Sequence, residues 1–533
     1  MSHVEVKRRQ IQAFAQLLGI VTLIVLGKAI GDNGITYLAA AVEGMTFFFL
    51  LFGNSVPDAL GRMLRSRNAK SQFKNAAKVR RNVMIFQSAL AVLAAAGLFF
   101  TSDILAENIF KVPYAALVMK VMAPALLVRI ISSVLLGYFQ GNGTQMPTVA
   151  VSVLRQVFWL GFGILFSGLL KGYGEKVSGL LLNESLASMY GAVGIAAAMA
   201  VTELILVVLL TVLYFASRRK ESGRQEGLKT TDTFWGSMGI LYGGMSSSIL
   251  LELLWRLPLW MGIIFYQKNA QDVSASVWDY GAYYGKYLVL CAFPALLYGA
   301  VMLPLSARTV GNIRKEEHRY AREVYGTAFQ IGVVNSLFAA VFLAVMANQA
   351  AGAFFDMRAE LAADMLQRGS AVILFGVLSV FFARVLTLTG KVHLVLCSFG
   401  AYAVSFIVGA AVFLNALDQG IHALVWAGVA AMGVLCAMLG FFAFRQMRAK
   451  VDILHSLAFP AASAGVTGGI CLLLGKLFTA HLGNLVTLVV CFAVGAALYW
   501  IILVFLRCFR EQQLSLIPGG SIIMKLGQLL RVM

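Results

Sequence analysis

The sequence predicts an all-α polytopic membrane protein with about fourteen transmembrane helices. Three observations indicate this class. The chain of 533 residues is 60% hydrophobic and only 13% charged, whereas a soluble domain usually carries about 25% charged residues. Apolar runs of about 20 residues, the length that crosses the hydrocarbon core, recur along the whole chain. Lysine and arginine gather in alternate connections between these runs, as in membrane proteins with a fixed orientation.

The apolar runs define the individual helices in chain order. They form two groups of six, followed by a final pair near the C-terminus. The seventh run is longer than the others and contains Pro258, so we expect a kink or a break there. The fourteen runs cover residues 11–30, 36–56, 82–101, 114–137, 148–169, 191–217, 237–265, 281–306, 327–348, 368–389, 393–414, 421–444, 456–478 and 484–506.

The positive charges predict the orientation of these helices. With the N-terminus in the cytoplasm, 29 of the 43 lysines and arginines fall in cytoplasmic loops and tails, and six fall in outer loops. This asymmetry follows the positive-inside rule. It accounts for the net charge of +19 and the pI of about 9.8 without nucleic acid as a partner. We therefore expect a multi-pass protein with both termini in the cytoplasm.

A weak internal repeat relates the two groups of six helices. Pro57 matches Pro304, and Gly143 matches Gly390, at a common offset of 247 residues. Internal repeats are a frequent construction of secondary transporters, whose substrate sites lie between the repeats. The expected domains are an N-terminal lobe of residues 1–235, a C-terminal lobe of residues 236–452, and a helix pair with its tail at residues 453–533.

Ionisable residues inside the predicted helices are the candidates for function, because such residues are costly in a bilayer and mark substrate or ion pathways. We expect no catalytic residue and no metal site among them. Lys286 and Arg384 lie near the ends of their helices, so extension of their charged groups to the interface is an alternative role for both. The candidates for substrate binding are Arg129, Arg155, Arg256, Lys286 and Arg384, and those for coupling are Glu43, Glu203 and Glu252.

Arg129 and Arg155 flank the short turn between the fourth and fifth helices. Each lies roughly 12 Å from the cytoplasmic end of its helix, at a rise of about 1.5 Å per residue. Two guanidinium groups at one depth repel each other unless an anion joins them, and the planar fork of arginine suits a phosphate. One hypothesis is a pyrophosphate cradle. The other is that Glu203 or Glu43 neutralises one arginine while phospholipid headgroups bind the second.

Glu252 and Arg256 are four residues apart in the segment SSSILLELLWRLPLW. This spacing places both on one helical face, where they can form an ion pair. The pair is either a structural contact within the helix or a cavity-facing pair that a proton, a cation or an anionic substrate breaks. Both interpretations remain open at this stage.

The junction LLGYFQGNGTQMPTVAVSVLRQ resembles the fourth-to-fifth helix junction of the MOP (MATE-type) exporter superfamily. It is most similar to the branch of polysaccharide exporters, SpoVB-like proteins and MurJ-like flippases. The segments LGKAIGDNGITYLAAAV and LPLSARTVGNIRKEEHRYAREV are also similar to parts of these proteins. The resemblance implies two six-helix lobes in a V-shape. It also implies that the last two helices form a groove for a polyprenyl tail.

The resemblance further implies a bacterial plasma-membrane transporter rather than an enzyme. The implied substrate is an undecaprenyl-pyrophosphate-linked oligosaccharide or a peptidoglycan precursor for cell-wall synthesis, flipped from the inner to the outer leaflet by alternating access. We find no P-loop. We therefore expect coupling to H⁺, Na⁺ or the membrane potential, without a bound cofactor, in a monomer surrounded by membrane lipids.

Alternatives to this function remain. Gln16 and Thr22 stand where MurJ-type flippases place arginines, so a more general saccharide exporter is as compatible as a lipid II flippase. A MATE-type drug or cation antiporter is the second possibility, although the buried charges are more basic than acidic. A membrane-embedded glycosyltransferase or polymerase is the third, and the short outer loops argue against it.

Overall fold

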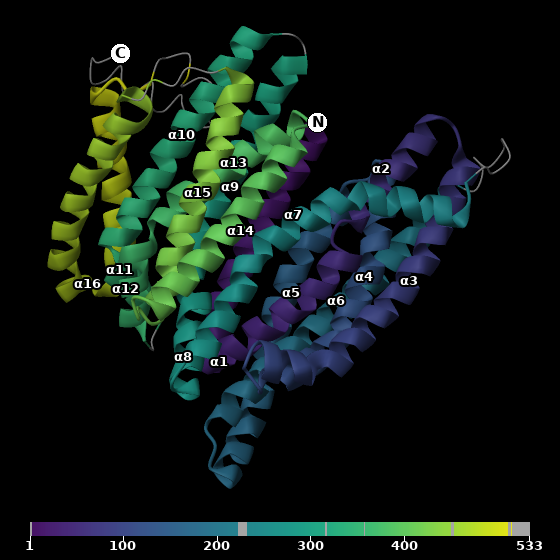
Figure 1. Ribbon diagram of the computed structural model, residues 1–533, viewed down its shortest axis with the longest axis horizontal. Helices are drawn as coiled ribbons and strands as arrows, with labels where there is room; N and C mark the ends of the chain where they lie inside the picture. Colours follow the sequence, from purple (N-terminus) through teal and green to yellow (C-terminus); the bar gives the residue numbers. More distant parts are fainter. Residues whose placement is uncertain are drawn as a thin grey trace. The chain divides into compact units, whose positions relative to one another are not determined.

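The computed structural model describes residues 3–221, 232–314, 317–355, 358–448, 452, 454–509 and 513, and the regular structure in these residues is helical throughout. Figure 1 shows the helices in chain order. The chain divides into two compact units. One comprises Val21–Gly285, and the other comprises Lys286–Met533 together with Met1–Ile20.

Thirteen helical stretches in the described part of the chain are long and apolar enough to cross a membrane. The first of them, Gln10–Ala69, passes through Gly31, which has a left-handed φ of 73°. Gly31 therefore divides this stretch into two limbs, which correspond to the first two predicted helices. The other twelve stretches each match one predicted helix. The prediction of an all-α membrane protein with about fourteen spans is confirmed.

The unit Val21–Gly285 is built from long helices that pack side by side. α6 packs along both α4 and α5, and α3 packs along α4. α7 stays helical through Pro258, so of the kink or break expected there the break is absent and the kink stays a prediction. The elements are α1 (His3–Phe52, beyond Ile20), α2 (Val56–Ala69), α3 (Phe73–Asp103), η1 (Ile104–Ile109), α4 (Ala115–Gly141), α5 (Met146–Leu181), α6 (Ser185–Glu221), α7 (Phe234–Asn269), α8 (Val273–Ala282) and the start of η3 (Tyr283–Tyr287).

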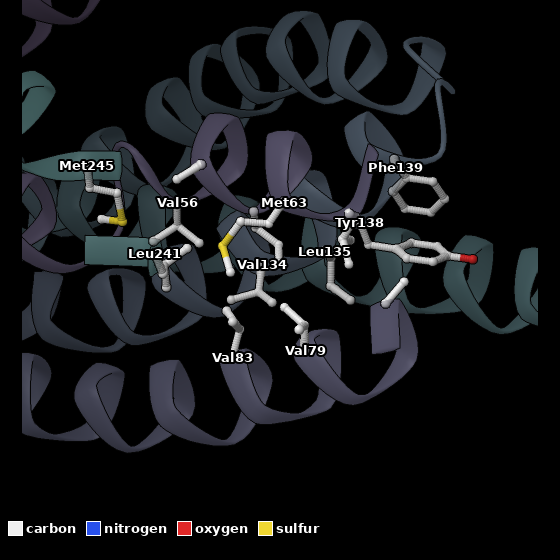
Figure 2. Packing of buried hydrophobic residues seen from close by; sticks show 14 of the residues in the cluster. Val56, Met63, Val79, Val83, Val134, Leu135, Tyr138, Phe139, Leu241 and Met245 are labelled. Atoms are coloured by element: carbon white, nitrogen blue, oxygen red, sulfur yellow. The ribbon is translucent and has the colours of Figure 1, made fainter. Parts of the chain in front are cut away.

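A hydrophobic cluster joins α2, α3, α4 and α7 in this unit. Figure 2 shows Val56 and Met63 of α2 directed toward Val134 of α4, with Leu241 and Met245 of α7 beside them. Side chains of α3, α5 and α6 complete the cluster. Burying these groups away from lipid gives dense packing contacts, which hold membrane helices together in place of a hydrophobic driving force.

The packing of α7 decides where the compact units divide, whereas the lobes predicted from the repeat stay a prediction. The predicted lobes meet at residues 235/236, just before α7. α7 instead packs on α2 and α3 and contributes Met238, Leu241 and Met245 to their cluster. The two compact units accordingly divide at residues 285/286. The final helix pair, expected to be appended to the C-terminal lobe, forms α16, which packs on α10 and α11 of the second unit.

The second unit has its own helical framework. α14 packs along α15, and α10 contacts α9, α13 and α16. α16 changes direction at Gly483, where φ is 72°, in the connection predicted between the last two spans. The elements are α9 (Leu288–Arg314), α10 (His318–Val345), α11 (Ala347–Phe354), α12 (Ala359–Gly369), α13 (Ala371–Leu388), α14 (Val392–Asn415), α15 (His422–Met447), η4 (Leu454–Ala458) and α16 (Phe459–Phe505).

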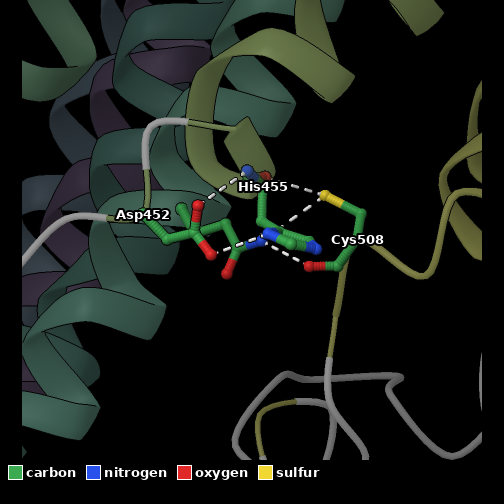
Figure 3. Close-up of polar contacts among 4 residues, drawn as sticks. Asp452, His455 and Cys508 are labelled. Carbon is green, nitrogen blue, oxygen red and sulfur yellow. Dashed lines mark hydrogen bonds and ion pairs between the residues drawn. The ribbon is translucent and has the colours of Figure 1, made fainter.

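Gln330 of α10 ties the two ends of the α16 hairpin together. Its Nε2 donates to the carbonyl oxygens of His455 (3.1 Å) and Cys508 (2.7 Å). The thiol of Cys508 donates to the carbonyl of His455 at 3.0 Å (Figure 3). Nδ1 of His455 lies 2.7 Å from Oδ2 of Asp452, and this hydrogen bond lowers the pKa of the Asp452 carboxyl. The start and the end of the hairpin are therefore fixed to one residue of α10.

The internal repeat is visible in the backbone of two turns. Gly143 after α4 has a φ of 81°, and Gly390 after α13 has a φ of 82°, a conformation that glycine adopts readily. The backbone hydrogen bonds correspond at the same offset of 247 residues. The pairs are Asn142 N to Tyr138 O with Thr389 N to Val385 O, Gly143 N to Gln140 O with Gly390 N to Thr387 O, and Thr144 N to Phe139 O with Lys391 N to Leu386 O.

Candidate functional site

The first cluster of buried charge centres on the carboxylate of Glu43 in α1, which accepts three hydrogen bonds. Arg256 Nη1 of α7 donates to Oε1 at 2.9 Å, and Trp260 Nε1 of the same helix donates to Oε2 at 2.8 Å. The hydroxyl of Tyr284 donates to Oε1 at 3.1 Å. A buried carboxylate needs a positive partner and satisfied lone pairs, and this arrangement supplies both.

Helical spacing explains why these side chains meet. Arg256 and Trp260 are four residues apart and share one face of α7. On α1, Phe47 lies four residues beyond Glu43, and its ring packs edge-on against Trp260 at a centroid distance of 5.6 Å. Tyr284 stacks on Tyr280 one turn earlier, at 6.2 Å. Each helix therefore presents a polar group and an aromatic ring to the others.

Arg256 does not pair with Glu252, the partner expected from the sequence. Its carboxylate partner is Glu43, 213 residues earlier in the chain. Within the described residues, Glu252 forms no hydrogen bond and no ion pair. The physical reason is that Glu43 lies on the helix that faces Arg256, where its two oxygens can also reach Trp260 and Tyr284.

The second cluster joins Arg129 of α4, Arg155 of α5 and Glu203 of α6. Arg155 binds Glu203 as a fork, with Nε to Oε1 at 2.7 Å and Nη2 to Oε2 at 3.1 Å. Arg129 Nε lies 3.8 Å from Oε1 of the same carboxylate. The Arg129 guanidinium also lies over the ring of Phe49, 4.5 Å from its centroid, and its Nε has no hydrogen-bond partner. Glu203 is thus the anion between the two arginines.

The two clusters belong to the same unit and are linked through α1. Glu43 and Phe49 are six residues apart, which is about 9 Å along a helix axis. Together the clusters contain three arginines and two carboxylates, so they carry one net positive charge. Such a charge in the middle of apolar helices favours an anionic ligand.

The carboxylates are more deeply buried than the arginines. Glu43 and Glu203 have side-chain exposures of 2% and 1%, whereas Arg129, Arg155 and Arg256 have 27%, 21% and 32%. Each carboxylate therefore lies behind the guanidinium that it holds. The three arginine side chains are partly exposed, although the Nε atom of Arg129 is itself buried. This order suits a site that presents fixed positive charge.

The remaining candidates lie in the other unit. Lys286 of η3 is buried, and its ammonium lies 5.6 Å from the centre of the Phe355 ring. Its charge therefore has a cation–π partner inside the protein. Arg384 is half-buried in α13. Among the described residues, the structure shows no group of three or more His, Cys, Asp or Glu side chains that could hold a metal ion.

Sequence reasoning missed Trp260, Tyr284 and Phe49. These residues are aromatic, and aromatic residues in apolar helices are usually packing groups. The available signal was the spacing of four between Arg256 and Trp260, which places an N–H donor beside a buried arginine. Nothing in the local sequence pointed to Tyr284 or Phe49.

Comparison with known proteins gives the class of fold. No protein-family model matches the chain. Over 145 residues it is 26% identical to Stage V sporulation protein B of Bacillus subtilis (strain 168), and this match spans 27% of each chain. The matched segment thus represents about a quarter of that relative.

Solved transporter structures resemble the chain over most of its length. The lipid II flippase MurJ in an inward closed conformation gives a TM-score of 0.65 at 11% identity, covering 92% of this chain and 96% of its own. An inward-facing multidrug resistance MATE family transporter of the MOP superfamily gives 0.61 at 12% identity, covering 81% and 94%. The chain therefore has the fold of MurJ and MATE proteins. The resemblance to the MOP superfamily noted in the sequence is confirmed at the level of the fold.

Proposed function

We propose that this chain is a membrane transporter that moves an anionic lipid-linked saccharide across the bilayer by alternating access. The observation that carries the proposal is the order of burial in the two clusters. Glu43 and Glu203 are almost fully buried and hold three arginines whose side chains are partly exposed. A pyrophosphate between lipid and sugar is an anion that arginine binds through paired hydrogen bonds.

The fold supports the same class of activity. The MurJ structure that it resembles is described as a lipid II flippase, and its MATE neighbour as a multidrug resistance transporter. The net positive charge of the clusters agrees better with the first kind of substrate than with a cation. An oligosaccharide or a peptidoglycan precursor on a polyprenyl pyrophosphate combines the required charge with a membrane anchor.

Coupling to an ion gradient is part of the proposal. A proton or cation that competes with Arg256 for the Glu43 carboxylate would release Arg256 for substrate, and this exchange links ion binding to substrate binding. Moving one charge through 100 mV is worth about 2.3 kcal/mol, which is enough to bias two conformations. The polyprenyl groove along α16 remains a prediction of the family resemblance.

Reconstitution in vesicles tests the substrate. Fluorescent lipid-linked saccharides are placed in one leaflet, and their appearance in the other is measured by a membrane-impermeant quencher. We expect translocation with the wild type and a loss of apparent affinity of about tenfold for Arg129→Gln, because one charge-assisted hydrogen bond to phosphate is removed. Arg129→Lys should recover part of it, since a point charge replaces a planar fork.

Two outcomes would contradict the proposal. Unchanged translocation by Arg129→Gln and Arg256→Gln would remove the arginines from the substrate site. Translocation that continues after the ion gradient and membrane potential are collapsed would remove the coupling role of Glu43 and leave the substrate assignment in place.

A cation antiporter is the second candidate, and Glu252 is the observation that favours it. This half-buried carboxylate forms no hydrogen bond or ion pair among the described residues. A carboxylate without such a direct contact can bind a proton or an organic cation in turn. Uptake of a fluorescent organic cation into the same vesicles, abolished by Glu252→Gln, would favour the antiporter over the flippase.

A further inference from the structure

A cavity of about 630 Å³ opens at one end of the second unit. Its walls are the last turn of α9, the first turn of α10, the turn between α13 and α14, and the end of α15. All four walls are helix ends on the side that the positive charges place in the cytoplasm. Because membrane helices end at the interface, the cavity lies at the depth of lipid headgroups.

The charged residues that line the cavity are all basic. They are His318 and Arg322 of α10 and Arg448 after α15. Within the part of the chain that the structure describes, none of the three forms a hydrogen bond or an ion pair, and all three are exposed. α10 begins at His318, so the unpaired amide groups of its first turn lie at the same end. Among the residues that the structure describes, the cavity therefore gathers donors and positive charge without a lining anion.

The internal repeat allows the turn at Gly390, which lines this cavity, to be compared with the equivalent turn at Gly143. In the first unit, side chains of α2 cover the equivalent turn after α4. Arg65 Nη2 donates to the carbonyl of Gln140 at 3.2 Å, and Asn68 Nδ2 donates to Asn142 Oδ1 at 3.0 Å. The position that matches Arg65 at the offset of 247 is Asn312, whose amide nitrogen is buried without a hydrogen-bond partner.

Among the described side chains of α9, none makes a covering hydrogen bond to the turn at Gly390, and this turn lines an open cavity. Positive charge is present there on Arg322 and Arg448, which come from other helices. A site that shows no such covering contact among the described residues, and that presents two arginines, is suited to an external ligand.

Apart from Thr389, Gly390 and Gln446, the rest of the lining is apolar, and this composition narrows the choice of ligand. The apolar side chains come from Val310, Ile313, Ala321, Leu388 and Met447. A volume of this size fits within the range of small-molecule sites, roughly 300–1,000 Å³. Basic groups beside apolar ones match a phosphate that is attached to acyl chains better than a free, fully hydrated phosphate.

We propose that this cavity binds the phosphate headgroup of an anionic membrane lipid. The guanidinium groups of Arg322 and Arg448 hold the phosphate oxygens, and Thr389 and His318 also line the cavity. The apolar lining receives the glycerol and the first carbons of the chains. The site is separate from the Glu43 and Glu203 clusters, which belong to the other unit.

Lipid titration of the purified full-length protein tests the site. The melting temperature in neutral detergent micelles is followed as phosphatidylglycerol is added, with phosphatidylcholine as the uncharged-headgroup comparison. We expect phosphatidylglycerol to raise the melting temperature and phosphatidylcholine to have little effect. Arg322→Gln with Arg448→Gln should need about 100-fold more phosphatidylglycerol, at about tenfold for each arginine.

The chain offers a matched control three residues earlier on each of the same helices. Arg319 is 97% exposed and Arg445 is exposed, and neither lines the cavity. Arg319→Gln with Arg445→Gln removes the same charge from the same two helix ends. This control should respond to phosphatidylglycerol as the wild type does. The variant Arg322→Lys with Arg448→Lys should need an amount of phosphatidylglycerol between those of the control and of the glutamine variant. Both charges remain in it, while the planar forks are lost.

Equal responses of the cavity variant and the control would overturn the proposal. If the double variant does not fold, the single change Arg322→Gln is measured in its place and should show a loss of about tenfold. A final arm adds glycerol 1-phosphate without lipid. Protection equal to that of phosphatidylglycerol would assign the cavity to a water-soluble phosphate ester and overturn the lipid assignment.

Discussion

Glu43 shows how a single carboxylate can organise three helical elements of a membrane protein. Both of its oxygens are bonded, to Arg256 and Tyr284 through one and to Trp260 through the other. Glu203 plays the same part for Arg155 and Arg129. In each case the acid is buried and the base is more exposed, so the acid positions the base rather than the reverse.

The first prediction concerns the energy of the Glu43–Arg256 pair. Glu43→Gln removes the negative charge and leaves Arg256 without its partner, so we expect the free energy of unfolding to fall by roughly 1.5–3 kcal/mol. Arg256→Gln should cost a similar amount. The double variant should lose less than the sum, because residues in one ion pair are coupled. Denaturant unfolding of the four proteins in micelles measures the cycle.

Glu252→Gln is the matched control for this cycle. It removes the same charge four residues from Arg256, yet Glu252 is not bonded to it. We expect a change within about 0.5 kcal/mol, as for substitutions that break no specific contact. Additive losses for Glu43 and Arg256, or a large effect at Glu252, would show that the wrong carboxylate has been assigned.

The candidate site was only partly predictable from the sequence. Glu43, Arg129, Arg155, Glu203 and Arg256 stood out, because ionisable residues in apolar helices are rare and costly. Their pairing was not predictable beyond nearest neighbours. Helical spacing favours Glu252 as the partner of Arg256, and only the packing of α1 against α7 brings in Glu43 instead.

At the scale of elements, the α5–α6 hairpin depends on close contact between backbones. Gly194 of α6 lies against Phe166 of α5, where an added Cβ would collide with the Phe166 carbonyl and come within 2.7 Å of the Ser167 Cα. Small residues at helix contacts let membrane helices approach in this way. Gly168, on α5 nearby, has no atom within 4 Å of an added Cβ.

The second prediction compares these two glycines. Gly194→Ala should lower the free energy of unfolding by about 1–3 kcal/mol, because backbone atoms cannot move aside as a flexible side chain can. Gly168→Ala should be neutral or stabilising by up to ~1 kcal/mol through helix propensity. Thermal unfolding of both variants in the same micelles measures the difference in stability between them. Equal effects at the two positions would mean that α5 and α6 are not in backbone contact at Gly194.

The third prediction concerns the junction that Gln330 makes with the ends of α16. Burial raises the pKa of the Cys508 thiol to about 11, because the charged thiolate is disfavoured away from water. At pH 8 only about one thiol in a thousand is then the reactive thiolate. We expect alkylation of Cys508 by iodoacetamide to be slow at pH 8 and to accelerate about tenfold per pH unit up to that pKa.

The same shift makes stability depend on pH. The folded state favours the neutral thiol of Cys508 more than the unfolded state does. The resulting contribution to the free energy of unfolding is therefore fully present below the ordinary thiol pKa. It is lost as the pH rises from there toward about 11. Mass spectrometry of native and denatured protein follows the alkylation. Rapid modification of native Cys508 at pH 8 would show that the junction is open.

At the scale of the whole molecule, the sequence predicted the helices well, and the division into two lobes stays a prediction. Apolar length and loop charge report each span directly, because each reflects the bilayer. The repeat was also readable, and the turns at Gly143 and Gly390 share conformation and hydrogen bonds. The grouping of α7 with α2 and α3 depends on tertiary packing, which leaves no periodic trace in the sequence.

The last prediction tests the orientation that the loop charges imply. Ser71 lies in the turn between α2 and α3, and Leu180 lies near the end of α5, where it is 83% exposed. α5 has 36 residues, about 54 Å of helix, so its end extends well beyond a hydrocarbon core of about 30 Å. Three membrane-crossing helices, α3, α4 and α5, separate the two positions. Ser71 and Leu180 must therefore lie on opposite sides of the membrane.

Cysteines introduced as Ser71→Cys and Leu180→Cys report the two sides through a membrane-impermeant maleimide. On intact cells, Leu180→Cys should be labelled above the level of the parent protein and Ser71→Cys should not. After permeabilisation, both should be labelled, because both positions are exposed. Labelling of Ser71→Cys alone on intact cells would invert the orientation. Labelling of both would mean that an even number of crossings separates them, so one of α3, α4 and α5 would not span the membrane.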